Sequence, residues 1–311
     1  MPNLKIVLLD ALTFGDTDLS GFEKFGDVKV YQTTSKEQTK DRITDVDVIV
    51  TNKVVITDEL MACAKDLKLI CVAATGMNNV DMQAAKQRDI KVKNVAGYST
   101  NSVIQHTFSM LFYLLGHSKY YDESVKNGSY SESEIFTDVS QPFFELNGKK
   151  WGVIGLGDIG QGVANIAKAF GADVFYYSTS GRNRNYDYHR TTLSNLLKTC
   201  DIISIHAPLN EKTNNLLDYE QLLTCQNKAI ILNLGRGGII NEDAVAKIVD
   251  EKDISFGLDV FVKEPLDKNS SLLSVKNKDR LYLTPHIAWT SMEAREKLID
   301  GVIANIDSVF N

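Results

Sequence analysis

Three residues in the second half of the chain carry side chains suited to acid–base and anion chemistry. Arg236 stands between glycines, Glu264 precedes a proline, and His286 follows one. A guanidinium stays charged at any working pH and can hold two oxygens of a carboxylate. An imidazole changes charge near neutral pH, and a neighbouring carboxylate orients it and favours its protonated form. These types together suit a substrate that carries a carboxylate and whose oxygen gains or loses a proton.

Each of these residues also has an ordinary structural interpretation. Arg236 could pair with a surface carboxylate, Glu264 and its proline could form a turn, and His286 could cap the next helix. All three, however, are expected after strands of one sheet, where α/β folds bind their ligands. Their joint occurrence therefore favours a functional site.

A glycine-rich segment lies between the apolar run 149–154 and the helical pattern of 161–170. In a G-x-G-x-x-G loop the first glycine allows a tight turn, the second admits a pyrophosphate and the third lets the helix pack on the strand. The start of the helix also favours phosphate. The alternative is a glycine-rich turn without a ligand. We assign to a dinucleotide site Gly155, Gly157, Asp158, Ile159 and Gly160.

The next expected strand ends on Ser178, where enzymes that prefer NAD place a carboxylate that binds the ribose hydroxyls. A serine does not repel a 2′-phosphate, and Arg182 or Arg184 could bind one. The segment therefore predicts a site that accepts NADP as well as NAD. The alternative is that both arginines are solvated loop residues.

Short apolar, β-branched runs alternate with helical stretches along nearly the whole chain, which predicts an α/β fold with doubly wound parallel sheets. The expected strands are 5–9, 28–31, 46–51, 69–73, 91–95, 150–154, 173–177, 202–206, 229–234, 256–260 and 281–283. A last helix is expected over 291–310.

The stretch from Thr100 to about Val125 has hardly any polar face, which predicts one helix that is buried all round. Such a helix could cross between two domains, pack against a second subunit, or both. It would expose a large apolar patch in a monomer. Two-fold association is the commonest way to cover such a surface, so we expect a homodimer.

Composition narrows the class of protein. The chain has 311 residues and a net charge of -6, which gives no reason to expect nucleic acid or a membrane as a partner. No apolar run is long enough for a span, and residues 1–10 are typical of a strand, not of a signal peptide. Four cysteines without C-x-x-C spacing indicate buried thiols, so we expect no metal site and a cytoplasmic protein.

Taken in order, several motifs resemble those of the D-isomer-specific 2-hydroxyacid dehydrogenase family over nearly the whole chain. Besides the nucleotide loop they are TG at 75–76 with NVD at 79–81, QHT at 105–107, HAPL at 206–209, NLGRGG at 233–238, LDVF at 258–261 with EP at 264–265, and TPHIA at 284–288. The resemblance implies an oxidoreductase that moves a hydride between NAD(P)H and a small 2-oxo or 2-hydroxy acid of D configuration. Arg236 would bind the carboxylate and carbonyl, and the Glu264–His286 pair would be the acid and base.

The resemblance also implies roles outside this triad. The backbone of Ala74, Thr75 and Gly76 would hold the substrate carboxylate, and Trp289 would wall the pocket. His206, Pro208 and Asp259 would lie near the cofactor; the alternatives are packing for His206 and capping of the next turn for Asp259. His106, on the apolar helix, is interpreted as a core histidine.

Members of this family have two α/β domains, so the resemblance implies a flavodoxin-like substrate domain, 1–98 and 288–311, into which a Rossmann domain, 99–287, is inserted. The active site would lie in the cleft between them, which closes on the substrate. The run 97–103 and Trp289 resemble the glycerate dehydrogenase and hydroxypyruvate reductase branch.

Two kinds of alternative remain. Formate and phosphite dehydrogenases share the superfamily, but formate dehydrogenase pairs its histidine with glutamine, which Glu264 does not match. A dinucleotide-sensing scaffold or corepressor could keep the same triad, although this chain has no disordered tails or basic patches for partners.

Overall fold

The computed structural model describes residues 3–182 and 184–311, which divide into two compact units. Unit 1 comprises Met1–Ser99 and Thr290–Asn311, and unit 2 comprises Thr100–Trp289. The boundaries expected from the sequence lie within two residues of these limits. No helix among the described residues has both the length and the apolar content to cross a bilayer.

Unit 1 has a sheet of strand order β2-β1-β3-β4-β5 in which every neighbouring pair is parallel. This is the flavodoxin-like order. Its elements are β1 (Leu4–Leu8), η1 (Ala11–Phe14), η2 (Ser20–Phe25), β2 (Gly26–Val30), α1 (Lys36–Ile43), β3 (Val48–Thr51), α2 (Asp58–Cys63), β4 (Leu69–Val72), α3 (Met82–Gln87), β5 (Lys91–Asn94) and α10 (Met292–Phe310). The strands β3 and β4 are buried throughout, as expected of parallel strands covered on both faces.

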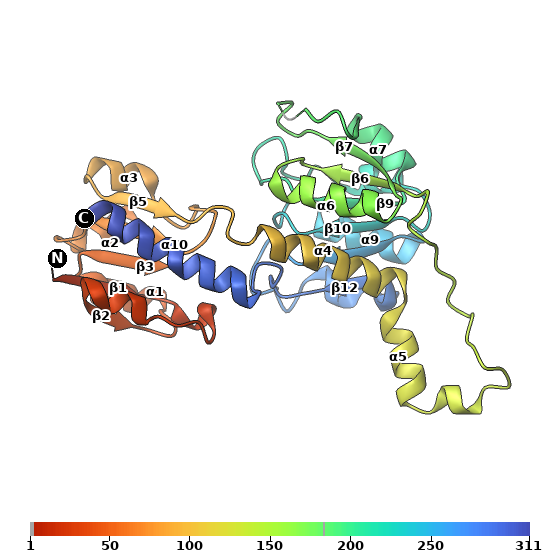
Figure 1. Ribbon diagram of the computed structural model, residues 1–311, viewed down its shortest axis with the longest axis horizontal. Helices are drawn as coiled ribbons and strands as arrows, with labels where there is room; N and C mark the ends of the chain where they lie inside the picture. The colour runs from red at the N-terminus through yellow and green to blue at the C-terminus, as the bar shows by residue number, and fades with distance from the viewer. Residues whose placement is uncertain (1–2, 183) are drawn as a thin grey trace. The chain divides into compact units, whose positions relative to one another are not determined.

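Unit 2 has a parallel sheet of order β12-β11-β10-β9-β6-β7-β8 (Figure 1). The chain order reverses between β6 and β9, which is the switch point where Rossmann folds bind a dinucleotide. Its elements are α4 (Thr100–Leu115), α5 (Ser118–Lys126), η3 (Ser129–Glu132), β6 (Lys150–Ile154), α6 (Asp158–Ala169), β7 (Asp173–Tyr177), β8 (His189–Arg190), α7 (Leu193–Thr199), β9 (Ile202–Ile205), α8 (Tyr219–Leu223), β10 (Ile230–Asn233), α9 (Glu242–Glu251), β11 (Ser255–Leu258), η4 (Ser271–Ser274), η5 (Lys278–Arg280) and β12 (Leu281–Leu283). The predicted fold class is confirmed.

The prediction of a single helix over 100–125 is wrong, because two helices, α4 and α5, cover this stretch. The chain breaks at Gly116 and His117, where the φ of His117 is 48°, and α5 then leads away from the sheet of unit 2 (Figure 1). Within α4, Met110 and Leu111 are completely buried, whereas α5 has no buried residue. The apolar side chains of α4 therefore pack mainly on unit 2. The burial ends where the more polar sequence of α5 begins.

Three of the cysteines, Cys71, Cys200 and Cys225, are buried as free thiols, and Cys63 is half-buried. Burial raises the pKa of each of the three buried thiols to about 12. They are therefore protonated and unreactive at neutral pH.

Candidate active site

Three neighbouring strands of unit 2 end beside the residues predicted to do chemistry. The strands β10, β11 and β12 are adjacent and parallel, so their carboxyl ends meet at one edge of the sheet. Arg236 follows β10, Glu264 follows β11 and His286 follows β12. The topology therefore gathers the loops of all three residues at the edge where such sheets bind ligands.

Glu264 and His286 are in direct contact. Nδ1 of His286 lies 2.7 Å from Oε2 of Glu264, and the backbone N–H of Phe261 donates to Oε1 at 3.0 Å. The side chain of His286 is 23% exposed and that of Glu264 is 28% exposed. An ionised carboxylate can only accept hydrogen bonds, so Nδ1 carries a proton. The remaining ring nitrogen, Nε2, is thus the one that can exchange a proton with a substrate.

Asp259 holds the backbone that follows this imidazole. His286 has a φ of 55°, in the left-handed region that residues other than glycine seldom adopt. The buried Asp259 accepts the N–H of Ile287 on Oδ1 and the N–H of Ala288 on Oδ2, both at 2.9 Å. Asp259 therefore stabilises the loop that carries His286, which is a different segment from the turn after its own strand.

Arg236 lies on a loop that the side chain of Asn233 braces. The N–H of Gly235 donates to Oδ1 of Asn233 at 3.1 Å, and Nδ2 of Asn233 donates to the carbonyl of Arg236 at 3.0 Å. The guanidinium is exposed and donates to the carbonyl of Gly235 at 2.8 Å. A Cβ on Gly237 would overlap the backbone of Phe261, so this loop packs directly on the loop that leads to Glu264.

The glycine-rich segment joins β6 to α6 as expected. Gly155 has a φ of 92°, and a Cβ on it would meet the backbone of Ala207 at 2.9 Å. A Cβ on Gly160 would overlap the carbonyl of Gly155, whereas one on Gly157 would have no atom within 4 Å. Two glycines thus allow close packing and the third leaves room for a ligand. Asp158 and Ile159 form the first turn of α6.

A hollow of about 250 Å³ lies beside this loop. Its lining residues are Leu156, Gly157, Asp158, Gln161, Arg184 and Asn185. Ser178, just beyond β7, is 7% exposed, and its Oγ has no hydrogen-bond partner among the described residues. Arg182 is exposed and does not line the hollow. The open space at Gly157 and the unpaired Ser178 hydroxyl fit the phosphates and ribose of a dinucleotide.

His206 follows β9, beside β6, and both of its ring nitrogens are buried without a partner among the described residues. Burial lowers the pKa of His206 to about 3, so its ring is neutral. The turn at Gly155 packs on the backbone of His206 and Ala207, and the carbonyl of Pro208 accepts the hydroxyl of Thr213 at 2.7 Å. Two unpaired nitrogens at the switch point also fit a ligand with polar groups.

The expected substrate loop belongs to unit 1. Ala74, Thr75 and Gly76 follow β4, and the carbonyls of Ala74 and Thr75 accept hydrogen bonds from Val95 and Asn94, respectively. Trp289 ends unit 2, three residues after His286, and is half-buried. The roles of these four residues stay predictions.

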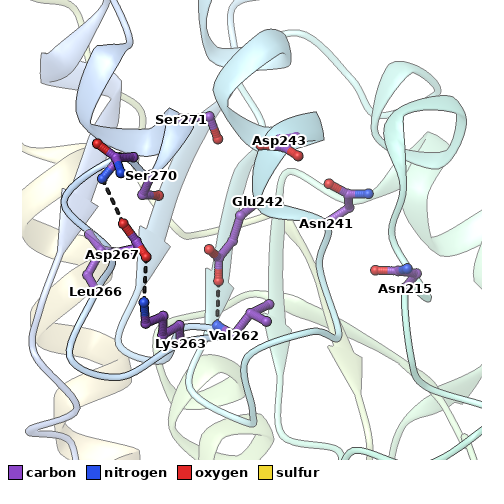
Figure 2. A pocket seen from close by; sticks show the side chains of 11 residues that line it. Asn215, Asn241, Glu242, Asp243, Val262, Lys263, Leu266, Asp267, Ser270 and Ser271 are labelled. Atoms are coloured by element: carbon purple, nitrogen blue, oxygen red, sulfur yellow. Dashed lines mark hydrogen bonds and ion pairs between the residues drawn. The ribbon is translucent and has the colours of Figure 1, made fainter.

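Another hollow of unit 2 does not lie at the predicted residues. It measures about 340 Å³ and is shown in Figure 2, where Glu242 accepts the N–H of Val262 and Lys263 pairs with Asp267. Glu242, Asp243 and Asp267 give its lining an excess of negative charge. Such a lining repels a carboxylate, so this hollow does not suit an acidic substrate.

Sequence reasoning assigned no role to Asn233 or Thr284, although both stand inside motifs that it singled out. Asn233 braces the loop of Arg236, and the hydroxyl of Thr284 donates to Asp259 at 2.6 Å. The available signal was position, because Asn233 ends the buried strand β10 and Thr284 follows β12.

Comparison with known proteins agrees with this geometry. Residues 108–288, more than half of the chain, match the family model described as "D-isomer specific 2-hydroxyacid dehydrogenase, NAD binding domain". A hydroxypyruvate reductase of Blautia hydrogenotrophica is 34% identical over 98% of this chain and 96% of its own. A glycerate dehydrogenase of Methylorubrum extorquens is 32% identical over 98% and 95%. The structure of an acyclic imino acid reductase with NADPH and D-Arg has a TM-score of 0.85 and 29% identity, covering 98% and 97%.

Proposed function

The chain belongs to the D-isomer-specific 2-hydroxyacid dehydrogenase family and is an NAD(P)-dependent oxidoreductase, and from this premise we propose that it reduces hydroxypyruvate or glyoxylate. The reverse reaction oxidises D-glycerate or glycolate. The observation that carries the proposal is the 2.7 Å contact between Glu264 and His286 at the sheet edge that also holds Arg236. A relative with matching length is named a hydroxypyruvate reductase, which supports this substrate class.

A nicotinamide dinucleotide held by the loop of Gly155 to Gly160 and by Ser178 would supply or accept the hydride. Arg236 binds the substrate carboxylate through its planar fork and polarises the carbonyl oxygen. Glu264 fixes the imidazole with Nδ1 inward and stabilises its charged form. In reduction, Nε2 of His286 gives its proton to the oxygen of the new alkoxide, and in oxidation the neutral ring takes the proton from the hydroxyl.

A steady-state panel tests this function. The purified chain is assayed with NADH and NADPH against hydroxypyruvate, glyoxylate, pyruvate and 2-oxoisocaproate. The proposal requires the highest kcat/KM with one of the first two acids and a product of D configuration where the product is chiral. If none of the four turns over, while the dinucleotide still binds, a dinucleotide-sensing scaffold is the better explanation.

We expect relaxed cofactor choice or a preference for NADPH, because Ser178 leaves the ribose pocket without a carboxylate and Arg184 lines the adjacent hollow. The variant Ser178→Asp places a negative charge against the 2′-phosphate. It should shift the ratio of kcat/KM values towards NADH by about 10- to 100-fold, the worth of one charged hydrogen bond. A wild type that already prefers NADH strongly would contradict this interpretation. Ser308→Asp, on α10, is the matched control.

We also infer a homodimer, on a surface that extends beyond the stretch 100–125 on which it was expected. The arm, residues 118–145, exposes Val125, Ile135, Phe136, Val139 and Phe143, and Phe136 is 90% exposed. Phe112 of α4 and Phe170 of α6 form a second exposed apolar patch, with ring centroids 5.5 Å apart. Two-fold pairing covers both surfaces at once, because the arm of each chain can lie on the partner.

Light scattering at micromolar concentration should give twice the mass of one chain. The double variant Phe136→Asp, Val139→Asp should shift the protein towards monomer, since it puts two charges into the apolar contact. Leu12→Asp changes an exposed apolar residue of unit 1 and should leave the dimer intact. A wild type that is a stable monomer rules the dimer out.

A further inference from the structure

A buried chain of side chains lies behind the loop of His286. His106 of α4, Thr284 after β12 and Asp259 after β11 come from three distant parts of unit 2. Nε2 of His106 lies 3.2 Å from Oγ1 of Thr284, whose hydroxyl lies 2.6 Å from Oδ1 of Asp259. The side chains of His106 and Asp259 are 15% and 1% exposed, respectively. None of the three residues belongs to the proposed acid–base pair.

Counting donors and acceptors sets the direction of this chain. Asp259 only accepts, so the single proton of the Thr284 hydroxyl points to Oδ1. The oxygen of Thr284 must then accept from His106, which places a proton on Nε2 of that ring. Burial lowers the pKa of His106, against the opposing effect of Asp259, so the ring donates as the neutral tautomer. The hydrogen bonds are therefore donated in one direction, from His106 to Thr284 and from Thr284 to Asp259.

Asp259 connects these hydrogen bonds to the loop that carries His286. Its two oxygens accept the N–H groups of Ile287 and Ala288, the residues that follow the left-handed His286. The carboxylate has to stand at one angle to meet both. The hydroxyl of Thr284 donates to Oδ1 and so fixes the orientation of the carboxylate. The hydroxyl itself keeps this direction only while its oxygen accepts a hydrogen bond from another group.

We propose that His106 is a positioning residue for His286, acting through Thr284 and Asp259 to hold the strained turn on which the imidazole stands. This inference rests on the proposed role of His286 as proton donor. It differs from the interpretation of His106 as a core histidine, since a core histidine only fills space. Loss of the His106 donor lets the Thr284 hydroxyl and the Asp259 carboxylate turn, and Nε2 of His286 then spends less time in line with the substrate oxygen.

The test compares His106→Leu, which removes the donor, with His106→Gln, whose amide N–H lies near the position of Nε2. Thr284→Val removes the hydroxyl that joins the two hydrogen bonds and keeps a side chain of nearly the same shape. Gln105→Leu, on the exposed neighbour in α4, is the matched control. Measured are kcat, the KM values for hydroxypyruvate and NADPH, and the unfolding midpoint. His106→Leu should lower kcat by about 10- to 100-fold, as for other residues that orient a ligating or catalytic group, with little change in the KM for NADPH.

Three further results are expected: His106→Gln restores most of kcat, Thr284→Val loses as much as His106→Leu, and the double variant loses no more than either single one. The inference is overturned if His106→Leu or Thr284→Val keeps the wild-type kcat, if their losses add, or if glutamine restores nothing. The variant His286→Ala in the same assay separates the two claims. If it stays active, the proposed acid–base role fails; if it is inactive while His106→Leu is normal, only the positioning role fails.

Discussion

Replacing His286 with alanine should lower turnover in the reductive direction by about 10²- to 10⁴-fold, the usual contribution of a positioned general acid. The variant lacks the nitrogen that Glu264 orients at 2.7 Å. Binding of NADPH should survive, because the glycine loop and Ser178 belong to different strands from β12. Cofactor binding is followed by NADPH fluorescence and turnover by NADPH absorbance.

The matched control for this variant is His189→Ala. His189 lies on β8, at the edge of the sheet opposite β12; its side chain is 66% exposed and lies 3.2 Å from Asp173. Its loss should leave kcat unchanged. Turnover of His286→Ala near the wild-type rate, with an unchanged fold, would remove His286 from the mechanism.

Replacing Arg236 with lysine should lower kcat/KM for hydroxypyruvate by about 10²- to 10³-fold, the cost of losing one stabilising donor at a reacting oxygen. Lysine keeps the positive charge but offers a point charge in place of a planar fork. The exposed guanidinium donates to the carbonyl of Gly235, and Asn233 braces the loop around it. The loop should therefore keep its shape when the side chain changes.

Two measurements make the Arg236 result specific. Arg280→Lys changes an arginine that precedes β12, at the amino end of the strand and not at the carboxyl end that leads to His286. This variant should keep the wild-type kcat/KM. Hydroxyacetone has the carbonyl of hydroxypyruvate without its carboxylate, so Arg236→Lys should narrow the difference in kcat/KM between the two. If Arg236→Lys loses activity equally on both compounds, carboxylate recognition belongs to other residues.

Much of the fold could be predicted because parallel strands leave a strong pattern. Apolar runs bounded by glycine, lysine or aspartate gave β6, β7 and β12 with their observed limits. Other strands shift by one or two residues at an end, as at β11, where Val260 is buried but lies beyond the strand. Apolar residues in the sequence indicate where side chains are buried, and burial continues beyond the last hydrogen bond of the strand. The sequence does not show where those hydrogen bonds end.

Elements without such a pattern were missed. The two residues of β8 are polar and exposed, and only pairing with β7 makes them a strand. The break between α4 and α5 depends on a left-handed His117, and nothing in the apolar periodicity requires it. Helical propensity falls at Gly116, and the burial of side chains stops after this point as well.

The candidate site divides in the same way. Arg236, Glu264 and His286 could be found because their chemistry and their motifs stand in the sequence. The chain from His106 through Thr284 to Asp259 could not, because it joins three segments that only the packing of α4 against β11 and β12 brings together. Residues that act through another residue carry no local signal of their own.

The central claim, that Glu264 and His286 act as one acid–base unit, is tested most directly by the pH–rate profiles of wild type and Glu264→Gln in both directions. Glutamine keeps the shape and a hydrogen bond but removes the negative charge that stabilises the imidazolium. Reduction needs the charged ring, so the upper limb of its profile should move to lower pH. Oxidation needs the neutral ring, so its rising limb should move the same way.

Each pH unit of that movement corresponds to about 1.36 kcal/mol of lost charge stabilisation. Glu220→Gln, which removes an exposed carboxylate on α8, is the control for a general effect of charge and should leave both profiles in place. The account predicts a parallel shift of both limbs to lower pH in Glu264→Gln alone. Profiles that do not move in either direction would contradict it, and would leave Glu264 a turn residue beside His286.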